Sequence, residues 1–485
     1  MKIAPHCIIV SALMTTAPAM GQVSPATETP VNAAATSTDE HQTAPPQANP
    51  MTETGEDSVV AEDLPLEVPQ ETPTVPKTPV PLQPNHDIRP HVAAEVEPAL
   101  AEPAPPAVPR EIPAETLPGW VSSLVPYGFI RLDTIWDSSR FQDAGPRSSQ
   151  FAMWVSPEPA GPGRNDGRLN IHPRLTRLGL KTNPLALSEH VKISGKVEVD
   201  FQGGGSESRQ FIRLRHAYLE LAAGPVTLLA GQTWDLVSPL FPAANNDGMM
   251  WNAGNTGDRR PQMRLTYEHR RERYAISLAA AALMTGAVDG KDSDADGEPD
   301  GFDASSPTVQ ARLGGEIKLW ANEPVKLGVW GHYAREEISV GSDVASSMVG
   351  FDASIPIIDA IALEGEGWMG QNLSDVRGGI GQGINSLGQE IDASGGWIQL
   401  KLVPCQKLQL FGGITLDNPN DADVDAGGRR HNQALYTVVR YRPWQSFQVA
   451  AEYLHWRTQY ADAADATPTV EGRANRIDFH LSYFL

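Results

Sequence analysis

The most constraining feature of the chain is an alternation of apolar and charged residues in segments long enough to cross a membrane as strands. In residues 190–202 the apolar positions are Val191, Ile193, Val197, Val199 and Phe201, and the charged positions between them are Lys192, Lys196, Glu198 and Asp200. A period of two residues indicates a β-strand with two different faces. Ionised side chains are costly inside a small soluble core, whereas a water-filled lumen accepts them. The alternation therefore favours strands with one face on lipid and the other on water.

The same pattern recurs in sixteen segments after Trp120. We expect strands at residues 127–136, 174–181, 190–202, 211–222, 226–233, 262–269, 273–283, 307–320, 324–336, 346–357, 360–371, 394–403, 406–415, 433–442, 445–457 and 474–485. An even number of strands lets a single-chain barrel close with both ends on the same side. The sequence thus predicts an all-β fold, a 16-stranded antiparallel transmembrane β-barrel over residues 119–485.

The connections alternate in length along almost the whole chain. The long ones are residues 137–173, 234–261, 284–306, 372–393, 416–432 and 458–473, and the short ones include residues 270–272, 321–323, 404–405 and 443–444. Outer-membrane barrels have long extracellular loops and short periplasmic turns. A soluble secreted β-protein, which is one alternative, has no reason to sort its loops in this way.

Two segments precede the expected barrel. Residues 1–21 combine Lys2, a short apolar run and the small-residue pattern Ala17-Pro18-Ala19, which is typical of a cleaved signal peptide. Residues 22–118 are rich in Pro, Ala, Thr and Glu and hold 16 acidic residues against 3 basic ones. Such a composition predicts a disordered segment. We expect it in the periplasm, either reaching toward the cell wall or acting as a passive spacer.

Several function classes are disfavoured. No run of 18 uninterrupted apolar residues occurs, so a membrane protein built of helices is not expected. The net charge of -21 predicts no nucleic-acid partner. No H-E-x-x-H, G-x-S-x-G, P-loop or Cys-x-x-Cys motif appears, so we expect no enzyme. A hydrolase that assembles Ser, His and Asp from neighbouring strands stays open as an alternative, because such triads form in space.

Residues 213–242, RLRHAYLELAAGPVTLLAGQTWDLVSPLFP, resemble the DcaP-like family of outer-membrane porins. In that family a comparable R-L-R-H-A-Y strand precedes a short turn and L-A-G-Q-T-W. The resemblance implies sixteen strands, a homotrimer in the outer-membrane lipid, and diffusion of small anionic solutes such as dicarboxylates. It also implies that the third extracellular loop, here residues 235–261, folds into the lumen as a constriction. Candidates for its narrowest point are Met249, Met250, Trp251, Arg259 and Arg260.

The sequence departs from the family in two places. The proline-rich segment stands where some members have a helical one, which argues against a coiled coil. The chain ends at Leu485 rather than at the usual terminal aromatic residue. The barrel-insertion signal is then expected to be weaker, or to use Tyr483 and Phe484.

Basic residues dominate the polar faces of the expected strands, which favours an anion pathway. The pore-lining candidates are Arg177, Lys192, Arg213, Arg215, Arg259, Arg260, Arg264, Arg312, Lys318 and Arg440. Arg213 and Arg215 lie two residues apart and would form a basic ladder beside the constriction. Alternatively, they pair with lumen acids and stiffen the wall.

Residues 292–303 read D-x-D-x-D-G-x-x-D-x-x-D, which is close to a calcium-binding loop. The candidate ligands are Asp292, Asp294, Asp296, Asp300 and Asp303. A Ca²⁺ ion would have a structural role in an extracellular loop, and the alternative is a solvated acidic loop. The favoured interpretation of the whole sequence is a porin for small, preferably anionic, solutes. Its main rival is a structural or adhesive outer-membrane barrel with Ca²⁺-ordered loops.

Overall fold

The computed structural model describes residues 123–142, 151–157, 167–206, 208–244, 247–461 and 470–485. The expected signal peptide and the proline-rich segment 22–118 lie outside the described residues and stay predictions. Within the described part, no helix is long and apolar enough to cross a membrane.

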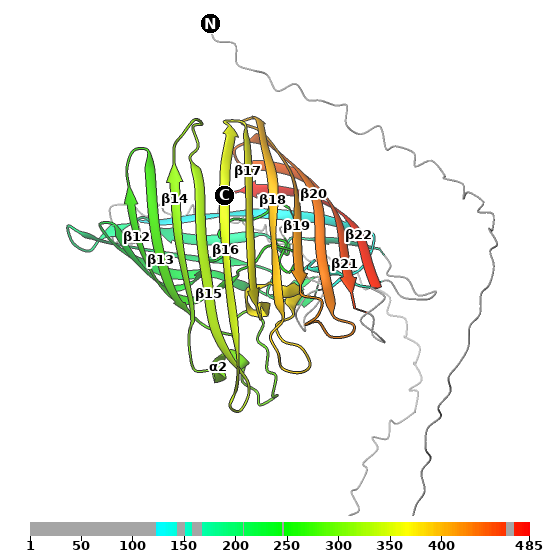
Figure 1. The fold of residues 1–485 in the computed structure, drawn as a ribbon. Coiled ribbons are helices and arrows are strands. Elements are labelled where there is room, and N and C mark those ends of the chain that lie inside the picture. The colour runs from blue at the N-terminus through cyan, green and yellow to red at the C-terminus, as the bar shows by residue number, and fades with distance from the viewer. Residues whose placement is uncertain (1–122, 143–150, 158–166, 207, 245–246, 462–469) are drawn as a thin grey trace, which may run out of the picture. The chain divides into compact units, whose positions relative to one another are not determined.

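A closed antiparallel sheet forms the folded part (Figure 1). Its strands are β1 (Leu124–Asp137), β4 (Arg168–His172), β5 (Arg177–Thr182), β7 (Val191–Asp200), β10 (Arg213–Ala223), β11 (Val226–Trp234), β12 (Arg259–Arg270), β13 (Tyr274–Leu283), β14 (Thr308–Ile317), β15 (Val325–Ser339), β16 (Ser342–Ile358), β17 (Ile361–Gln371), β18 (Asp392–Cys405), β19 (Leu408–Pro419), β20 (Arg429–Trp444), β21 (Phe447–Tyr460) and β22 (Val470–Phe484), with β6 (Leu185–Ala186) as a short addition beside β7. β4 and β5 both pair with β1, and they are two parts of one crossing that breaks at Pro173. Sixteen crossings therefore close the barrel, and the predicted fold class is confirmed.

The first and last strands close the barrel. Residues 129–137 of β1 pair in register with residues 476–484 of β22, from Phe129 opposite Phe484 to Asp137 opposite Arg476. The rings of Phe129 and Phe484 lie 5.9 Å apart, centroid to centroid. Phe484 therefore takes part in closure, although Leu485 ends the chain. We call this β1–β22 pairing the seam.

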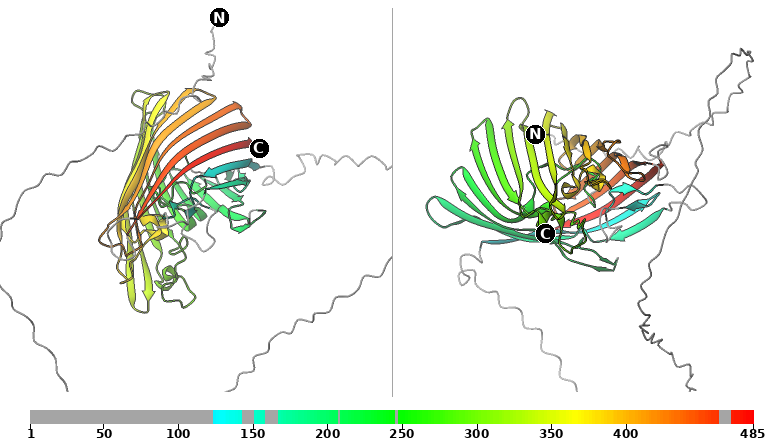
Figure 2. Two further views of the ribbon diagram at one scale, coloured as in Figure 1. Left: turned by 90° about the vertical axis from the view of Figure 1, so that its right-hand side faces the viewer. Right: turned by 60° about the horizontal axis from the view of Figure 1, so that its bottom comes forward.

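Long connections gather at one end of the barrel, at the bottom of Figure 1, and short turns at the other. We call these the loop end and the turn end. The loop end carries the short helix α2 (Asp300–Asp303) and the 3-10 turns η2 (Ser374–Val376) and η3 (Gly379–Gly381). One hairpin departs from the expected pattern: β15 and β16 extend to Ser339 and Ser342, so only a tight turn joins them at the loop end. Figure 2 brings the loop end forward and shows loop segments within the ring of strands.

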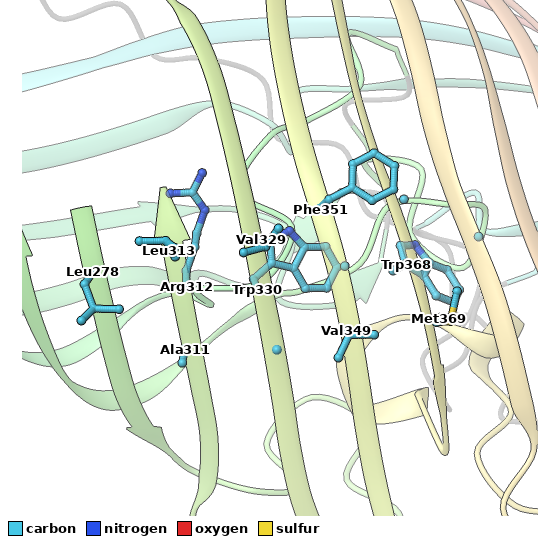
Figure 3. Close-up of a pocket in the computed structure, with 14 residues that line it drawn as sticks. Leu278, Ala311, Arg312, Leu313, Val329, Trp330, Val349, Phe351, Trp368 and Met369 are labelled. Atoms are coloured by element: carbon cyan, nitrogen blue, oxygen red, sulfur yellow. The ribbon is translucent and has the colours of Figure 1, made fainter. Parts of the chain in front are cut away.

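The two faces of the wall differ as the alternation predicts. Exposed apolar side chains cover the outside, among them Ile130, Leu132, Leu178, Leu265, Leu278, Leu313, Val329, Phe351, Met369 and Ile398. Figure 3 shows part of this face, where a hollow of about 750 Å³ lies over β13–β18. Glycines such as Gly331 and Gly367 help to line it. Its lining is apolar apart from Arg312, so this hollow is a feature of the outer surface and not of a solute pathway.

Leu313→Arg is expected to weaken folding into a bilayer. Leu313 faces outward in the middle of β14, between Leu278 and Val329. An arginine there would place its charge in hydrocarbon, which costs about 2–4 kcal/mol near the bilayer centre. A denaturant titration of folding into lipid vesicles measures this loss. The matched control is Leu387→Arg, at a solvent-exposed position between β17 and β18. Equal losses in both variants would contradict the lipid-facing position of Leu313.

Candidate pore and constriction

The connection between β11 and β12 folds into the barrel and packs on its inner wall. We call residues 235–258 the constriction loop. Its residues Ala243, Ala244, Met250 and Ala253 join a buried cluster with wall residues that include Phe411, Tyr436 and Trp456. At Gly254, with φ of +115°, an added Cβ would lie 2.3 Å from the carbonyl oxygen of Gly396. The loop backbone therefore touches the wall directly, and only glycine allows that approach.

A single carboxylate anchors the start of this loop. Glu366, on β17, accepts hydrogen bonds from the hydroxyl of Ser238 and from the backbone N–H of Leu240, the latter at 2.7 Å. Two wall side chains hold the loop further along. Gln399 accepts from the N–H of Ala243 at 2.9 Å, and the indole N–H of Trp368 donates to the carbonyl of Gly254 at 2.8 Å. The constriction loop is thus fixed at several points around the wall.

A second loop also folds inward, and sequence reasoning missed it. We call residues 372–391, between β17 and β18, the second loop. Leu373, Val376 and Ile380 are completely buried in it. Asp375 accepts from the backbone N–H groups of Gly286 and Val288, at 3.0 and 2.9 Å, and so ties in the loop between β13 and β14. The three apolar side chains, in a segment otherwise rich in Gly, Ser and Asn, are the signal that could have revealed it.

Arg260 was expected to line the pore, and the structure corrects this. Its side chain is fully buried. Its guanidinium pairs with Asp235 at 3.0 Å and with Asp375 at 2.6 Å, so it joins the constriction loop to the second loop. The constriction loop also ends earlier than expected, because Arg259 and Arg260 already belong to β12. Arg260 is therefore a structural cation that no solute can reach.

The neighbouring pair Asp258 and Arg377 makes a second link between the two loops. Their closest N–O distance is 3.0 Å. Burial raises the pKa of Asp258, but the charges of Arg377, Arg259 and Arg213 outweigh it and lower the pKa to about 2. A carboxylate with a lowered pKa stabilises the folded state above its ordinary pKa, and that contribution is lost only as the pH falls toward about 2. The link is therefore ionic at neutral pH.

A cavity of about 860 Å³ lies toward the loop end. Arg213, Arg259 and Arg377 line it, together with the acids Asp258 and Asp289. The guanidinium carbon of Arg259 lies 4.4 Å from the ring centre of Trp234, and that of Arg377 lies 4.9 Å from the ring centre of Trp251. Such stacking holds an arginine head in place while leaving its N–H donors available.

Arg213 and Arg215 both face the lumen, and both pair with acids on β7. Arg213 contacts Asp200 at 2.6 Å, and Arg215 contacts Asp200 at 2.9 Å and Glu198 at 2.7 Å. A β-bulge between Leu214 and His216 shifts the register, so that His216 is buried beside Arg215. After the bulge, the positions of β10 that face the lumen are shifted by one residue. The ladder thus exists, and so do the ion pairs that were its alternative.

Bases still exceed acids in this cluster. Arg177 and Lys196 approach the same Glu198 at 3.4 and 3.3 Å. Four cations therefore share two carboxylates, which leaves a formal charge of +2. Glu198 and Asp200 are almost completely buried, whereas the side chains of Arg177 and Arg213 keep 29% and 22% exposure. The acids lie behind the arginines, so the surface facing the lumen is positive.

Two deeper cavities, of about 450 and 280 Å³, share Arg177, Arg215, Met249 and Arg440. The cationic residues that line one or both are Arg131, Arg177, Arg213, Arg215, Lys401, Arg440 and Arg442, and the acidic ones are Asp247 and Glu364. With seven bases against two acids, the combined lining of these two cavities is strongly basic. Met249 and Trp251 reach it from the constriction loop.

The remaining pore-lining candidates lie elsewhere. Lys192 and Lys318 lie toward the turn end, on β7 and just after β14. Arg312 pairs with Asp352 at 2.7 Å, and Arg264 donates to Gln262 and to the carbonyl of Trp234. None of these four belongs to the lining of the two basic cavities.

The five expected calcium ligands do not all lie together in the acidic loop. Carboxylate oxygens of Asp292, Asp294 and Asp296 lie within 4.8 Å of one another, at exposed positions. Asp300 turns away and accepts from the N–H and hydroxyl of Ser293, at 2.7 and 2.6 Å. Asp303 lies in α2. The calcium site stays a prediction of the sequence, with three ligands better placed than the other two.

The fold of the chain is similar to that of a solved outer membrane channel. No protein-family model and no curated protein matches the chain. Among solved structures, the outer membrane channel DcaP of Acinetobacter baumannii is similar, with 16% identity over 75% of this chain and 97% of that one and a TM-score of 0.57. The chain has a porin fold. The expected likeness to DcaP-like porins is thus confirmed at the level of the fold.

Other solved porins match over the same share of the chain. The anion-selective porin from Comamonas acidovorans shares 11% identity over 75% of this chain and 99% of that one, with a TM-score of 0.49. The OmpF of Salmonella typhi, in complex with daunomycin, shares 10% identity over 75% and 97%, with a TM-score of 0.46.

Glu366→Ala is expected to loosen the constriction loop of this porin fold. The change leaves the N–H groups of Leu240 and Trp397 without this acceptor, at a cost of about 1–3 kcal/mol for each buried unsatisfied group, whereas the hydroxyl of Ser238 can still donate to Asn255. Single-channel recordings in planar bilayers should show a higher conductance with more open-channel noise. Glu316→Ala, a lumen acid that pairs with Arg270 near the turn end, is the control. Unchanged recordings from the Glu366 variant would rule out this anchor.

Calcium is expected to protect the loop between β13 and β14 from proteases. Binding by Asp292, Asp294 and Asp296 would order the segment, so limited proteolysis should slow on addition of Ca²⁺ and not of Mg²⁺. Asp294→Asn should abolish the protection. Asp421→Asn, in the loop between β19 and β20, should leave it intact. Cleavage at the same rate with and without Ca²⁺ would favour a solvated acidic loop.

Proposed function

We propose that the protein is a passive outer-membrane porin that favours small hydrophilic anions. The observation that carries this proposal is the lining of the two basic cavities beside the constriction loop, where seven bases face two acids. Fixed cationic side chains in a narrow passage raise the local concentration of anions and repel cations. No moving part and no chemical step is needed, because the solute diffuses through.

The arginines are held in a way that suits carboxylate solutes. Arg177 stacks on Phe129 at 5.3 Å, Arg440 on Phe411 at 5.0 Å and Arg442 on Phe484 at 4.4 Å. A stacked guanidinium keeps its fork of N–H donors free for a planar anion. Several such heads around one cavity could contact two carboxylates of one molecule at once. This supports dicarboxylates as a solute class.

The other expectations belong to the same proposal. A homotrimer follows from the resemblance of residues 213–242 to the DcaP-like family. We expect residues 22–118 in the periplasm, where they could reach the cell wall. We expect no enzymatic activity. A structural or adhesive barrel remains the rival, and it differs because a closed anchor carries no steady current across a bilayer.

Ion selectivity tests the proposal directly. In a salt gradient across a planar bilayer, the reversal potential of the wild type should show a preference for anions. Arg177→Gln and Arg442→Gln should each lower it, because one charge at about 4 Å contributes about 1 kcal/mol even in water, or about fivefold in permeability. Arg271→Gln, on an exposed turn outside both cavities, is the matched control. A cation preference, or no channel at all, would overturn the proposal.

A further inference from the structure

The seam gathers four titratable side chains on the lumen face. Asp133 of β1 lies directly opposite His480 of β22. Asp478, two residues before His480, lies directly opposite Glu452 of β21. Opposed residues on one face of an antiparallel pair have Cβ atoms about 4.5–5.5 Å apart. Strand register alone therefore brings these groups together, and all four are at least 97% buried.

Two polar atoms in this group have no hydrogen-bond partner among the described residues. They are Nδ1 of His480 and Oδ1 of Asp478. His480 Nδ1 lies 3.8 Å from the other oxygen of Asp478, too far for a hydrogen bond. A buried unsatisfied polar atom costs about 1–3 kcal/mol. Two of them on neighbouring buried groups indicate that a ligand belongs there.

We propose that Asp133, Asp478 and His480 form a site for a divalent transition-metal ion of the Zn²⁺ type across the seam. One donor atom from each of the three lies within 4.8 Å of the others. In tetrahedral coordination, zinc bonds of about 2.0–2.2 Å place two donors about 3.3–3.6 Å apart. The side chains therefore need to draw together by up to about 1 Å, which small rotations of the side chains can supply. An imidazole nitrogen with carboxylate oxygens suits Zn²⁺ better than Ca²⁺ or Mg²⁺.

The charge of the surroundings favours a cation. Arg131 donates to Asp133 at 2.5–3.0 Å and approaches Asp478 at 3.9 Å. Arg440 lies on β20, level with Ala450 and hence with His480. Three acids, Asp133, Asp478 and Glu452, against these two bases leave a formal charge of -1. The charge of Arg476, which also acts on Asp478, is offset by Asp137 at 2.7 Å. Each carboxylate has about four lone-pair sites, so Arg131 can keep its contacts while an ion binds.

The ion has a route to the site and a structural effect there. His480 lines the cavity of about 280 Å³ together with Arg131, Arg440 and Ser482. The imidazole therefore borders the lumen, and the basic lining of that cavity slows the entry of a cation without changing the affinity of the site at equilibrium. Once bound, the ion would join the first strand of the barrel to the last. A ligand that binds only the folded state stabilises that state. Metal binding is therefore expected to reinforce closure at the seam.

Metal stoichiometry and spectroscopy test the proposal. The protein is purified from outer membranes, stripped with EDTA and titrated with Zn²⁺ or Co²⁺. We expect about one equivalent of Zn²⁺ per chain, a visible absorption band from bound Co²⁺, and a higher unfolding temperature with Zn²⁺. His480→Gln and Asp478→Asn should lose all three effects. His455→Gln, on the outward face of β21, should keep them.

Heat-modifiable gel mobility establishes that each variant is folded. X-ray absorption of the Zn²⁺-loaded wild type, which needs no variant, should show one imidazole ligand with carboxylate oxygens. A wild-type protein that binds no Zn²⁺ would overturn the proposal. Binding that survives undiminished in folded His480→Gln and Asp478→Asn would also overturn it, because the ion would then lie elsewhere.

Discussion

The buried guanidinium of Arg260 is the contact on which the interior of the barrel depends. It joins Asp235, at the start of the constriction loop, to Asp375, in the second loop, from a fixed point on β12. Removing one partner of a buried ion pair costs about 3–5 kcal/mol, because the other charge is left without compensation. Asp375 also accepts backbone N–H groups from the loop between β13 and β14. Three loops far apart in the sequence are therefore held by one cation, and the passage keeps a fixed shape.

Because the loops are fixed, the side chains that line the constriction keep set positions. Loops that carry Met249, Trp251 and Arg377 would otherwise be free in a water-filled lumen, where ordering each side chain costs conformational entropy. The hydrogen bonds to Glu366 and Gln399 offset that entropy cost during folding, so the loop is already ordered when a solute enters. Arginines stacked on Trp234 and Trp251 then present donors at set positions. A preorganised lining selects by charge without moving.

The sequence predicted the wall well and the interior poorly, for a physical reason. Strand alternation is local, so the sixteen crossings and the inward side of Arg177, Arg213 and Arg215 follow from residues near each other in the chain. The burial of Arg260 depends on Asp375, 115 residues away, and nothing in the local pattern distinguishes it from Arg259. The bulge at Arg215 and His216 is likewise invisible, because it depends on how β10 pairs with β7. The second loop was missed because its buried residues Leu373, Val376 and Ile380, although spaced like one face of a helix, lie in a glycine-rich segment that forms only the short turns η2 and η3.

The acids of the lumen explain how so many arginines can share one passage. Seven cations around two small cavities would repel one another and favour an expanded wall. Glu198, which meets Arg177, Lys196 and Arg215, and Asp200, which meets Arg213 and Arg215, offset that repulsion from buried positions behind the cations. They remain too few to neutralise them. The proposed selectivity for anions thus depends on carboxylates that no solute touches. They fix the arginine heads in place and leave the surplus of positive charge on the side that faces the water.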